Sequence, residues 1–320
     1  MDQRLNEVCK KLSPDNIAPS DPKILIDGEV GYGIINPNST IQYKDQSFLM
    51  GYIVNNDKNW MIPLRDFPDG SYALFRNGNE YCEIVSDPVA SRKIWYYMDS
   101  KVFIAATSQR AIIMLLGSFS FNENVIPWML STGTLGPGFS WDKRIKQLSP
   151  DSSVILDKKK WEVRVSSRLI EFKEVKRTKD EHKELLLKSL MLSFKGLNLD
   201  LSKWALPLSG GYDSRGILCI LLTINSAYKD IQTITWGLKA SASVKGNDAS
   251  VAGELAERLS VRNKYYINDI TNDSIETIID RFVKLGEGQI DNISDYLDGF
   301  KMWKDISEDG IEGIIRGDEG

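Results

Sequence analysis

The chain has 320 residues, 42% hydrophobic and 26% charged, a balance ordinary for a folded globular protein and a length that suggests two domains. A formal net charge of −4 argues against a protein whose main task is to bind nucleic acid, and no apolar run is long enough to span a membrane. The single histidine and three scattered cysteines argue against His-dependent catalysis, zinc sites and a disulfide framework. We therefore expect a cytoplasmic protein without nucleic-acid or membrane partners.

The first half of the chain alternates short β-patterned runs with turn signals. Such runs cover residues 30–35, 69–75, 81–85, 93–98 and 102–106. Residues 77–79 and 98–100 have the composition of hairpin turns, and residues 108–116 are expected to form a short helix. We predict mostly antiparallel sheets with a few helices for residues 1 to about 165.

The pattern changes beyond residue 166 to alternating helices and strands. Helices are predicted at 179–196, 215–224 and 248–259, and strands at 204–208 and 231–238. Asp248 is the expected N-cap of the third helix. Because strands and helices alternate at this spacing, we predict an α/β domain with a parallel sheet. The domain boundary is placed in the charged stretch 168–177.

The strand at 204–208 runs directly into a glycine turn and then a helix. Adjacent glycines let the backbone approach a ligand closely, and the free amides at a helix start form a donor-rich cradle for phosphate. Hydroxyl groups and one carboxylate in the turn could add donors and an oxygen ligand for Mg²⁺. The predicted phosphate-binding residues are therefore Ser209, Gly210, Gly211, Tyr212, Asp213 and Ser214, with Asp213 as the expected ligand of Mg²⁺. The GxxxxGK[ST] and GxGxxG phosphate loops are both absent.

This turn closely resembles the SGGxDS signature of the ATP pyrophosphatase (PP-loop) superfamily. The strand at 233–237, the helix opening at 247–252 and the glycine/acidic segment at 314–320 follow in the order found in the synthetase domain of the asparagine synthetase family. The resemblance implies Mg²⁺ ligands at Asp213 and Asp318, an adenine pocket with Trp236 and Gly237, and a cofactor contact at Gly317. The last loop is shortened, which leaves open whether Asp318 or Glu319 matches the metal-binding acid. Glu319 is also a candidate catalytic residue.

Segments of the first half are similar to the same family. Residues 69–73 resemble its G-x-F/Y-A strand, residues 86–97 its RDxxGxxPLYY hairpin, and residues 133–134 and 145–150 its linker to the synthetase domain. The resemblance implies a degenerate glutamine amidotransferase-like domain at 1–167, with an Ntn-hydrolase-like α-β-β-α sandwich. It implies an ATP-binding domain at 178–320 with the PP-loop (adenine nucleotide α-hydrolase-like) fold, incomplete at its C-terminus.

The sequence departs from glutamine-dependent members of that family at two places. Those members carry a cysteine nucleophile directly after the initiator methionine, where this chain has Asp2. Cys9 lies in a helical pattern and is a poor substitute. Met50 and Gly51 stand in place of the oxyanion-hole Asn-Gly pair. We therefore predict a domain that keeps its fold and lacks glutaminase activity, as in β-lactam synthetases and lasso-peptide cyclases.

The resemblance implies an ATP- and Mg²⁺-dependent ligase that adenylates a small-molecule or peptide carboxylate for attack by an amine. Asparagine synthesis from ammonia and a non-catalytic nucleotide- or partner-binding protein are the alternatives. Glu287 is a candidate substrate-side acid, the alternative being an exposed loop carboxylate. The family usually continues beyond the acidic loop, so we expect either a truncated chain or a second subunit that completes the domain. Homo-oligomerisation stays open.

Overall fold

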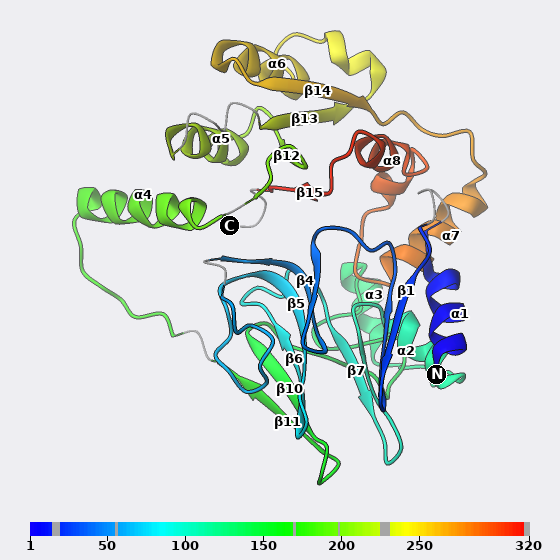
Figure 1. Ribbon diagram of the computed structural model, residues 1–320. Helices are drawn as coiled ribbons and strands as arrows, with labels where there is room; N and C mark the ends of the chain where they lie inside the picture. The colour runs from blue at the N-terminus through cyan, green and yellow to red at the C-terminus, as the bar shows by residue number, and fades with distance from the viewer. Residues whose placement is uncertain (15–19, 55–56, 169–170, 198, 225–230, 317–320) are drawn as a thin grey trace. The chain divides into compact units, whose positions relative to one another are not determined.

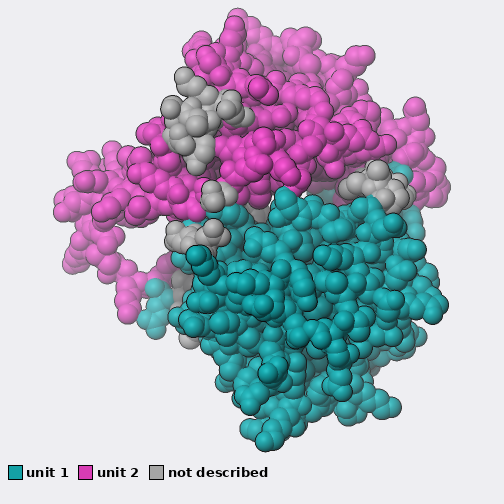
Figure 2. Space-filling view, in the orientation of Figure 1, with its two compact units in different colours: residues 1–171, 279–293 teal, residues 172–278, 294–320 magenta. Residues whose placement is uncertain are grey.

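The computed structural model describes residues 1–14, 20–54, 57–168, 171–197, 199–224 and 231–316 (Figure 1). They form two compact units (Figure 2): unit 1 comprises Met1–Glu171 and Ile279–Ile293, and unit 2 comprises Phe172–Ile278 and Ser294–Gly320. The chain first passes between them within the charged stretch where the boundary was placed. It then returns to unit 1 for residues 279–293, although these residues lie within the predicted ATP-binding domain at 178–320.

The main sheet of unit 1 has six antiparallel strands in the order β11-β10-β6-β5-β4-β3 (Figure 1). The strands are β3 (Ile41–Lys44), β4 (Ser47–Ile53), β5 (Gly70–Asn77), β6 (Tyr81–Ser86), β10 (Ser152–Asp157) and β11 (Glu162–Ser167). Side chains alternate between its faces, so Leu74 and Val85 enter one core while Ala73 and Ile84 enter another. The central strands are therefore buried on both sides.

A second antiparallel sheet packs against one face of the first. It contains β7 (Trp95–Met98), β8 (Phe103–Ala106) and β9 (Lys146–Gln147) in the order β8-β7-β9. Tyr96 shares a core with Ala73 and Ile84 of the larger sheet, whereas its neighbour Trp95 packs against Ile112 of helix α2 (Gln109–Leu116). This part of unit 1 is thus layered as sheet, sheet and helix.

The remaining elements of unit 1 are a hairpin and two helices. They are β1 (Lys23–Asp27) with β2 (Val30–Ile34), α1 (Asp2–Leu12) and α3 (Val125–Thr132). The turns predicted at 77–79 and 98–100 do connect β5 to β6 and β7 to β8.

None of the helices in the described part of the chain combines the length and apolar character that a bilayer crossing requires.

Unit 2 is built on four parallel strands in the order β14-β13-β12-β15. The strands are β12 (Trp204–Pro207), β13 (Gln232–Gly237), β14 (Arg262–Ile267) and β15 (Gly313–Ile314). The helices are α4 (Lys179–Lys195), α5 (Tyr212–Ile224), α6 (Asp248–Leu259) and α8 (Lys301–Glu308), with 3-10 turns η3 (Lys239–Ser243) and η4 (Ile293–Tyr296). Helix α7 (Ile275–Gly286) leads from unit 2 into unit 1.

Two cores cover opposite faces of this sheet. Leu206 and Leu208 pack with residues of α5 and α6, whereas Ala205 and Ile234 pack with residues of α8. The alternation follows the two-residue period of a strand, which buries both faces of a parallel sheet. The predicted mixed α/β class is therefore confirmed, with antiparallel sheets in the first half and a parallel sheet in the second.

Candidate functional site

The strand order of unit 2 identifies one edge of its sheet as the place for a ligand. From β12 the chain adds β13 and then β14 on one side, and it later places β15 on the other side of β12. The direction of chain progression thus reverses at β12. In open parallel sheets, ligands bind beyond the carboxyl ends of the strands at such a reversal point. The segment that leaves the carboxyl end of β12 is the predicted glycine loop, residues 209–214.

The glycine loop has the predicted strand–turn–helix setting. Strand β12 ends at Pro207, and α5 begins at Tyr212, three residues earlier than predicted. Leu208 continues the contact with β13 beyond the end of β12. Its N–H donates to the carbonyl of Ile234 at 2.8 Å, and its carbonyl accepts from the Thr235 hydroxyl at 2.7 Å. The start of the loop is therefore fixed to the central strands, while residues 211–213 are exposed.

Hydrogen bonds within unit 2 fix the shape of the loop. The Ser209 N–H donates to the Ser214 hydroxyl at 3.2 Å, and the Gly211 N–H donates to the Ser209 hydroxyl at 3.1 Å. The Gly210 N–H donates to Oδ1 of Asp248 at 2.9 Å. These three amides are engaged, whereas the first-turn amides of α5 have no intrahelical acceptor, as in any α-helix. The arrangement directs those helix-start amides toward the carboxyl edge, as phosphate binding requires.

The two remaining side chains of the loop are exposed. The Tyr212 side chain is 86% exposed, with the Arg215 guanidinium 4.7 Å from its ring centroid. Arg215 also donates from Nε to the Gly211 carbonyl at 2.9 Å, which places a fixed positive charge beside the loop. Asp213 lies in the first turn of α5 and is exposed. An exposed carboxylate beside phosphate-directed amides is a suitable oxygen ligand for Mg²⁺.

The predicted Mg²⁺ ligands lie far apart in the sequence, at Asp213 in α5 and at Asp318 or Glu319 near residue 320. Gly317, Asp318 and Glu319 lie outside the described residues. Within the described ranges, no group of three or more His, Cys, Asp or Glu side chains lies together as a metal site. Asp213 is thus the one predicted Mg²⁺ ligand that the structure places.

Trp236 and Gly237 occupy the carboxyl end of β13, and the structure gives both a packing role. The Trp236 ring lies on the α8 face of the sheet, with its centroid 6.0 Å from that of Trp303. A Cβ atom at position 237 would lie 2.5 Å from the hydroxyl of Tyr265, which donates to the Leu238 carbonyl at 2.9 Å. Packing therefore explains both residues without a ligand, and the adenine pocket stays a prediction.

The N-cap of α6 differs by one residue from the prediction. Asn247, not Asp248, caps the helix, and its side-chain oxygen accepts from the Ser250 N–H at 2.9 Å. Asp248 is consequently the first helical residue, and its carboxylate accepts the hydrogen bond from the Gly210 N–H. The two loops that follow β12 and β13 are joined by this contact.

Glu287 belongs to unit 1 and is engaged there, so the alternative of an exposed loop carboxylate is wrong. One carboxylate oxygen accepts from the Ser108 hydroxyl, and the other accepts from the Gln109 N–H at 2.9 Å, at the start of α2. The Glu287 carbonyl accepts from Gln109 Nε2 at 2.7 Å and from Trp141 Nε1 at 3.1 Å. Burial raises the pKa of the Glu287 carboxyl, and the bonds from Ser108 and Gln109 oppose that rise only in part. The carboxylate acts as a helix cap supplied from a distant segment.

Replacing Glu287 with alanine is expected to destabilise unit 1 by about 1–3 kcal/mol, because the Ser108 hydroxyl and Gln109 N–H lose their acceptor. Urea unfolding followed by fluorescence measures this change. Asp280→Ala is the matched control, since Asp280 lies in the same segment but forms an exposed i,i+4 pair with Lys284; it should cost at most about 0.5 kcal/mol. Equal effects of the two variants would contradict the capping role.

The features that imply a lost glutaminase are placed in unit 1. Asp2 begins helix α1, which packs on the β1–β2 hairpin. Cys9 is 5% exposed, and a Cβ atom at Gly33 would lie 2.7 Å from its sulfur, so the thiol is packed against the hairpin. Burial raises the pKa of the Cys9 thiol. Because a catalytic cysteine must be accessible and readily ionised, Cys9 does not meet the requirements of a nucleophile.

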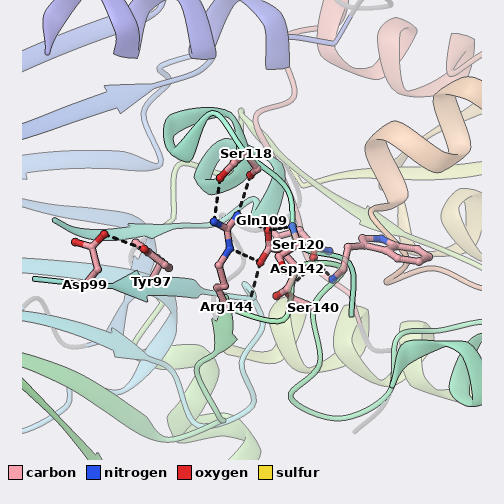
Figure 3. Close-up of polar contacts among 9 residues, drawn as sticks. Tyr97, Asp99, Gln109, Ser118, Ser120, Ser140, Asp142 and Arg144 are labelled. Atoms are coloured by element: carbon pink, nitrogen blue, oxygen red, sulfur yellow. Dashed lines mark hydrogen bonds and ion pairs between the residues drawn. The ribbon is translucent and has the colours of Figure 1, made fainter. Parts of the chain in front are cut away.

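Sequence reasoning missed a buried ionic cluster in unit 1 (Figure 3). Asp142 is fully buried, and it accepts from the Ser120 N–H at 2.9 Å and from two guanidinium nitrogens of Arg144 at 2.9 and 2.6 Å. Arg144 also donates to the Ser118 hydroxyl and carbonyl at 2.9 and 2.8 Å. Burial alone would raise the pKa of Asp142, but the hydrogen bonds from Arg144 and from the Ser120 N–H together outweigh it and lower the pKa. Because these bonds hold the segment that follows α2 against the segment that precedes β9, we interpret this cluster as structural.

Comparison of the sequence with protein-family models and with curated proteins finds no match. The geometry of the glycine loop and its place in the sheet therefore carry the functional argument.

Proposed function

We propose that this chain binds ATP at the glycine loop and uses it to activate a carboxylate as its adenylate, for attack by an amine. The observation that carries the proposal is a Ser-Gly-Gly-Tyr-Asp-Ser loop at the carboxyl end of the strand where chain progression reverses. Its position suits a phosphate ligand, and its sequence resembles that of ATP pyrophosphatases. We also propose that unit 2 has the PP-loop fold and that unit 1 is an Ntn-hydrolase-like sandwich without glutaminase activity.

The residues of the loop would hold the phosphates rather than react with them. The first-turn amides of α5 bind phosphate oxygens, and the hydroxyls of Ser209 and Ser214 keep the preceding turn in place. Asp213 and, by resemblance, Asp318 would hold Mg²⁺, which supplies charge neutralisation on the pyrophosphate when bound. Arg215, fixed to the Gly211 carbonyl, adds positive charge close by. Acceleration would come from electrostatic stabilisation and from positioning of the amine against the acyl carbon.

The substrate would be a small-molecule or peptide carboxylate. The proposal requires no nucleophile from the enzyme, in agreement with a chain that has one histidine. An ATP-consuming activity would also fit the expected cytoplasmic location.

Exchange of labelled pyrophosphate into ATP tests this function. The purified chain is incubated with Mg²⁺, ATP, labelled pyrophosphate and a panel of amino acids, dicarboxylic acids and peptides. We expect exchange that depends on both Mg²⁺ and one class of carboxylate. Aspartate-dependent exchange with asparagine formed from ammonia would identify the simpler synthetase reaction. Tight ATP binding with no exchange for any carboxylate would overturn the ligase and favour a non-catalytic nucleotide-binding protein.

A further inference from the structure

The contact between Asp248 and Gly210 places a second carboxylate beside the glycine loop. Asp248 Oδ1 accepts from the Gly210 N–H at 2.9 Å, and a Cβ atom at Gly210 would lie 2.7 Å from that oxygen. A side chain at position 210 would thus displace the Asp248 carboxylate from this contact. Asp248 is the first residue of α6, so its backbone is held by a regular helix whose start is capped by Asn247.

This contact has two separable physical effects. The hydrogen bond fixes the orientation of the Gly210 peptide, which precedes the helix-start amides of α5. The negative charge, together with that of Asp213, repels a phosphate that approaches the same amides. A carboxylamide at position 248 would keep the first effect and remove the second, because its oxygen can accept the same N–H.

We propose that Asp248 is a positioning and specificity residue that makes the glycine loop prefer magnesium-complexed ATP over metal-free ATP. This inference rests on the proposed ATP site. Metal-free ATP brings the full negative charge of its phosphates close to the carboxylates of Asp213 and Asp248. Bound Mg²⁺ reduces the net charge of ATP, and the repulsion between Asp248 and the phosphates is then weaker. The hydrogen bond to Gly210 meanwhile keeps the loop in its binding shape in both cases.

The test is the affinity for ATP, measured by isothermal titration calorimetry at low ionic strength, with Mg²⁺ and with EDTA. Three variants are compared with the natural chain: Asp248→Asn, Asp248→Ala and Asp269→Asn. Asp269 is a matched control, because it is an exposed aspartate at the same edge of the sheet whose Oδ1 accepts a backbone N–H, that of Lys239, at 2.9 Å.

We expect Asp248→Asn to bind metal-free ATP about fivefold more tightly than the natural chain, with magnesium-ATP affinity changed by less than about twofold. Added salt should shrink the fivefold gain, because Asp248 is exposed and its charge is screened. Asp248→Ala should weaken magnesium-ATP binding about tenfold, since the Gly210 N–H loses its acceptor. Asp269→Asn should match the natural chain in both conditions.

Each departure from this pattern has a definite meaning. If Asp248→Asn binds metal-free ATP no more tightly than the natural chain does, the specificity role is overturned while the ATP site stands. If Asp248→Ala binds magnesium-ATP as well as the natural chain, the positioning role is overturned. If the natural chain binds no ATP with Mg²⁺, the proposed function itself fails.

Discussion

Replacement of Asp213 with alanine is expected to weaken magnesium-ATP binding by at least about 30-fold, because a metal-held phosphate loses a carboxylate ligand in the first turn of α5. Metal-free ATP should not share this loss, since Asp213 contributes no attraction to a bare phosphate. The preference for magnesium-ATP should therefore largely disappear. Titration calorimetry with and without Mg²⁺ measures both affinities.

Asp200→Ala provides the control for this change. Asp200 is also an exposed aspartate of unit 2, but it precedes β12 at the amino end of that strand, where its carboxylate accepts from Ser202 at 3.1 and 2.6 Å. Its replacement should leave both ATP affinities within about twofold of the natural values. An Asp213→Ala variant that binds magnesium-ATP as tightly as the Asp200→Ala variant would contradict the metal assignment.

Replacement of Arg76 with alanine is expected to destabilise unit 1 by about 3–5 kcal/mol, because it leaves the Glu83 carboxylate buried without its charge partner. Arg76 and Glu83 are 0% and 2% exposed, and their side chains meet at 3.0 Å. The guanidinium also donates to the Trp60 carbonyl at 2.7 Å and to the Arg65 carbonyl at 2.8 Å. Its removal would orphan several buried acceptors at once.

Urea unfolding of unit 1, monitored by tryptophan fluorescence, measures this loss. Lys284→Ala is the comparison, since Lys284 forms an exposed ion pair with Asp280 in the same unit, and it should cost at most about 0.5 kcal/mol. If the alanine variant does not fold, Arg76→Lys retains the charge but loses the planar fork, and it should still lower the midpoint clearly. Similar midpoints for the Arg76 and Lys284 variants would contradict the structural role.

The features that the sequence predicted well are those that depend on neighbours along the chain. The strand at 204–208, the glycine turn and the helix that follows are encoded within about twenty residues, so hydrophobic periodicity and turn residues suffice to place them. The predicted N-cap was wrong by a single position, because Asn247 and Asp248 are both good caps and only the geometry distinguishes them.

The features that the sequence did not predict depend on residues far apart in the chain. Glu287 accepts a hydrogen bond from the hydroxyl of Ser108, which is 179 positions away in the sequence, and no local pattern links the two. Arg76 and Asp142 are charged residues of types that are usually exposed, and only the folded structure shows that both are buried. Residues 279–293 are joined to the rest of unit 1 by the Glu287 contacts with Ser108, Gln109 and Trp141, and no change of composition marks this return.

Hydrogen–deuterium exchange with and without magnesium-ATP tests whether ATP binds at the glycine loop, because it locates the ligand as well as detecting it. We expect slower exchange in peptides that cover residues 207–217, at the glycine loop and the start of α5, and unchanged exchange in the β1–β2 hairpin of unit 1. Protection at residues 207–217 that is lost in the Asp213→Ala variant would support the site. Magnesium-ATP that leaves these residues unprotected, or protects only unit 1, would contradict it.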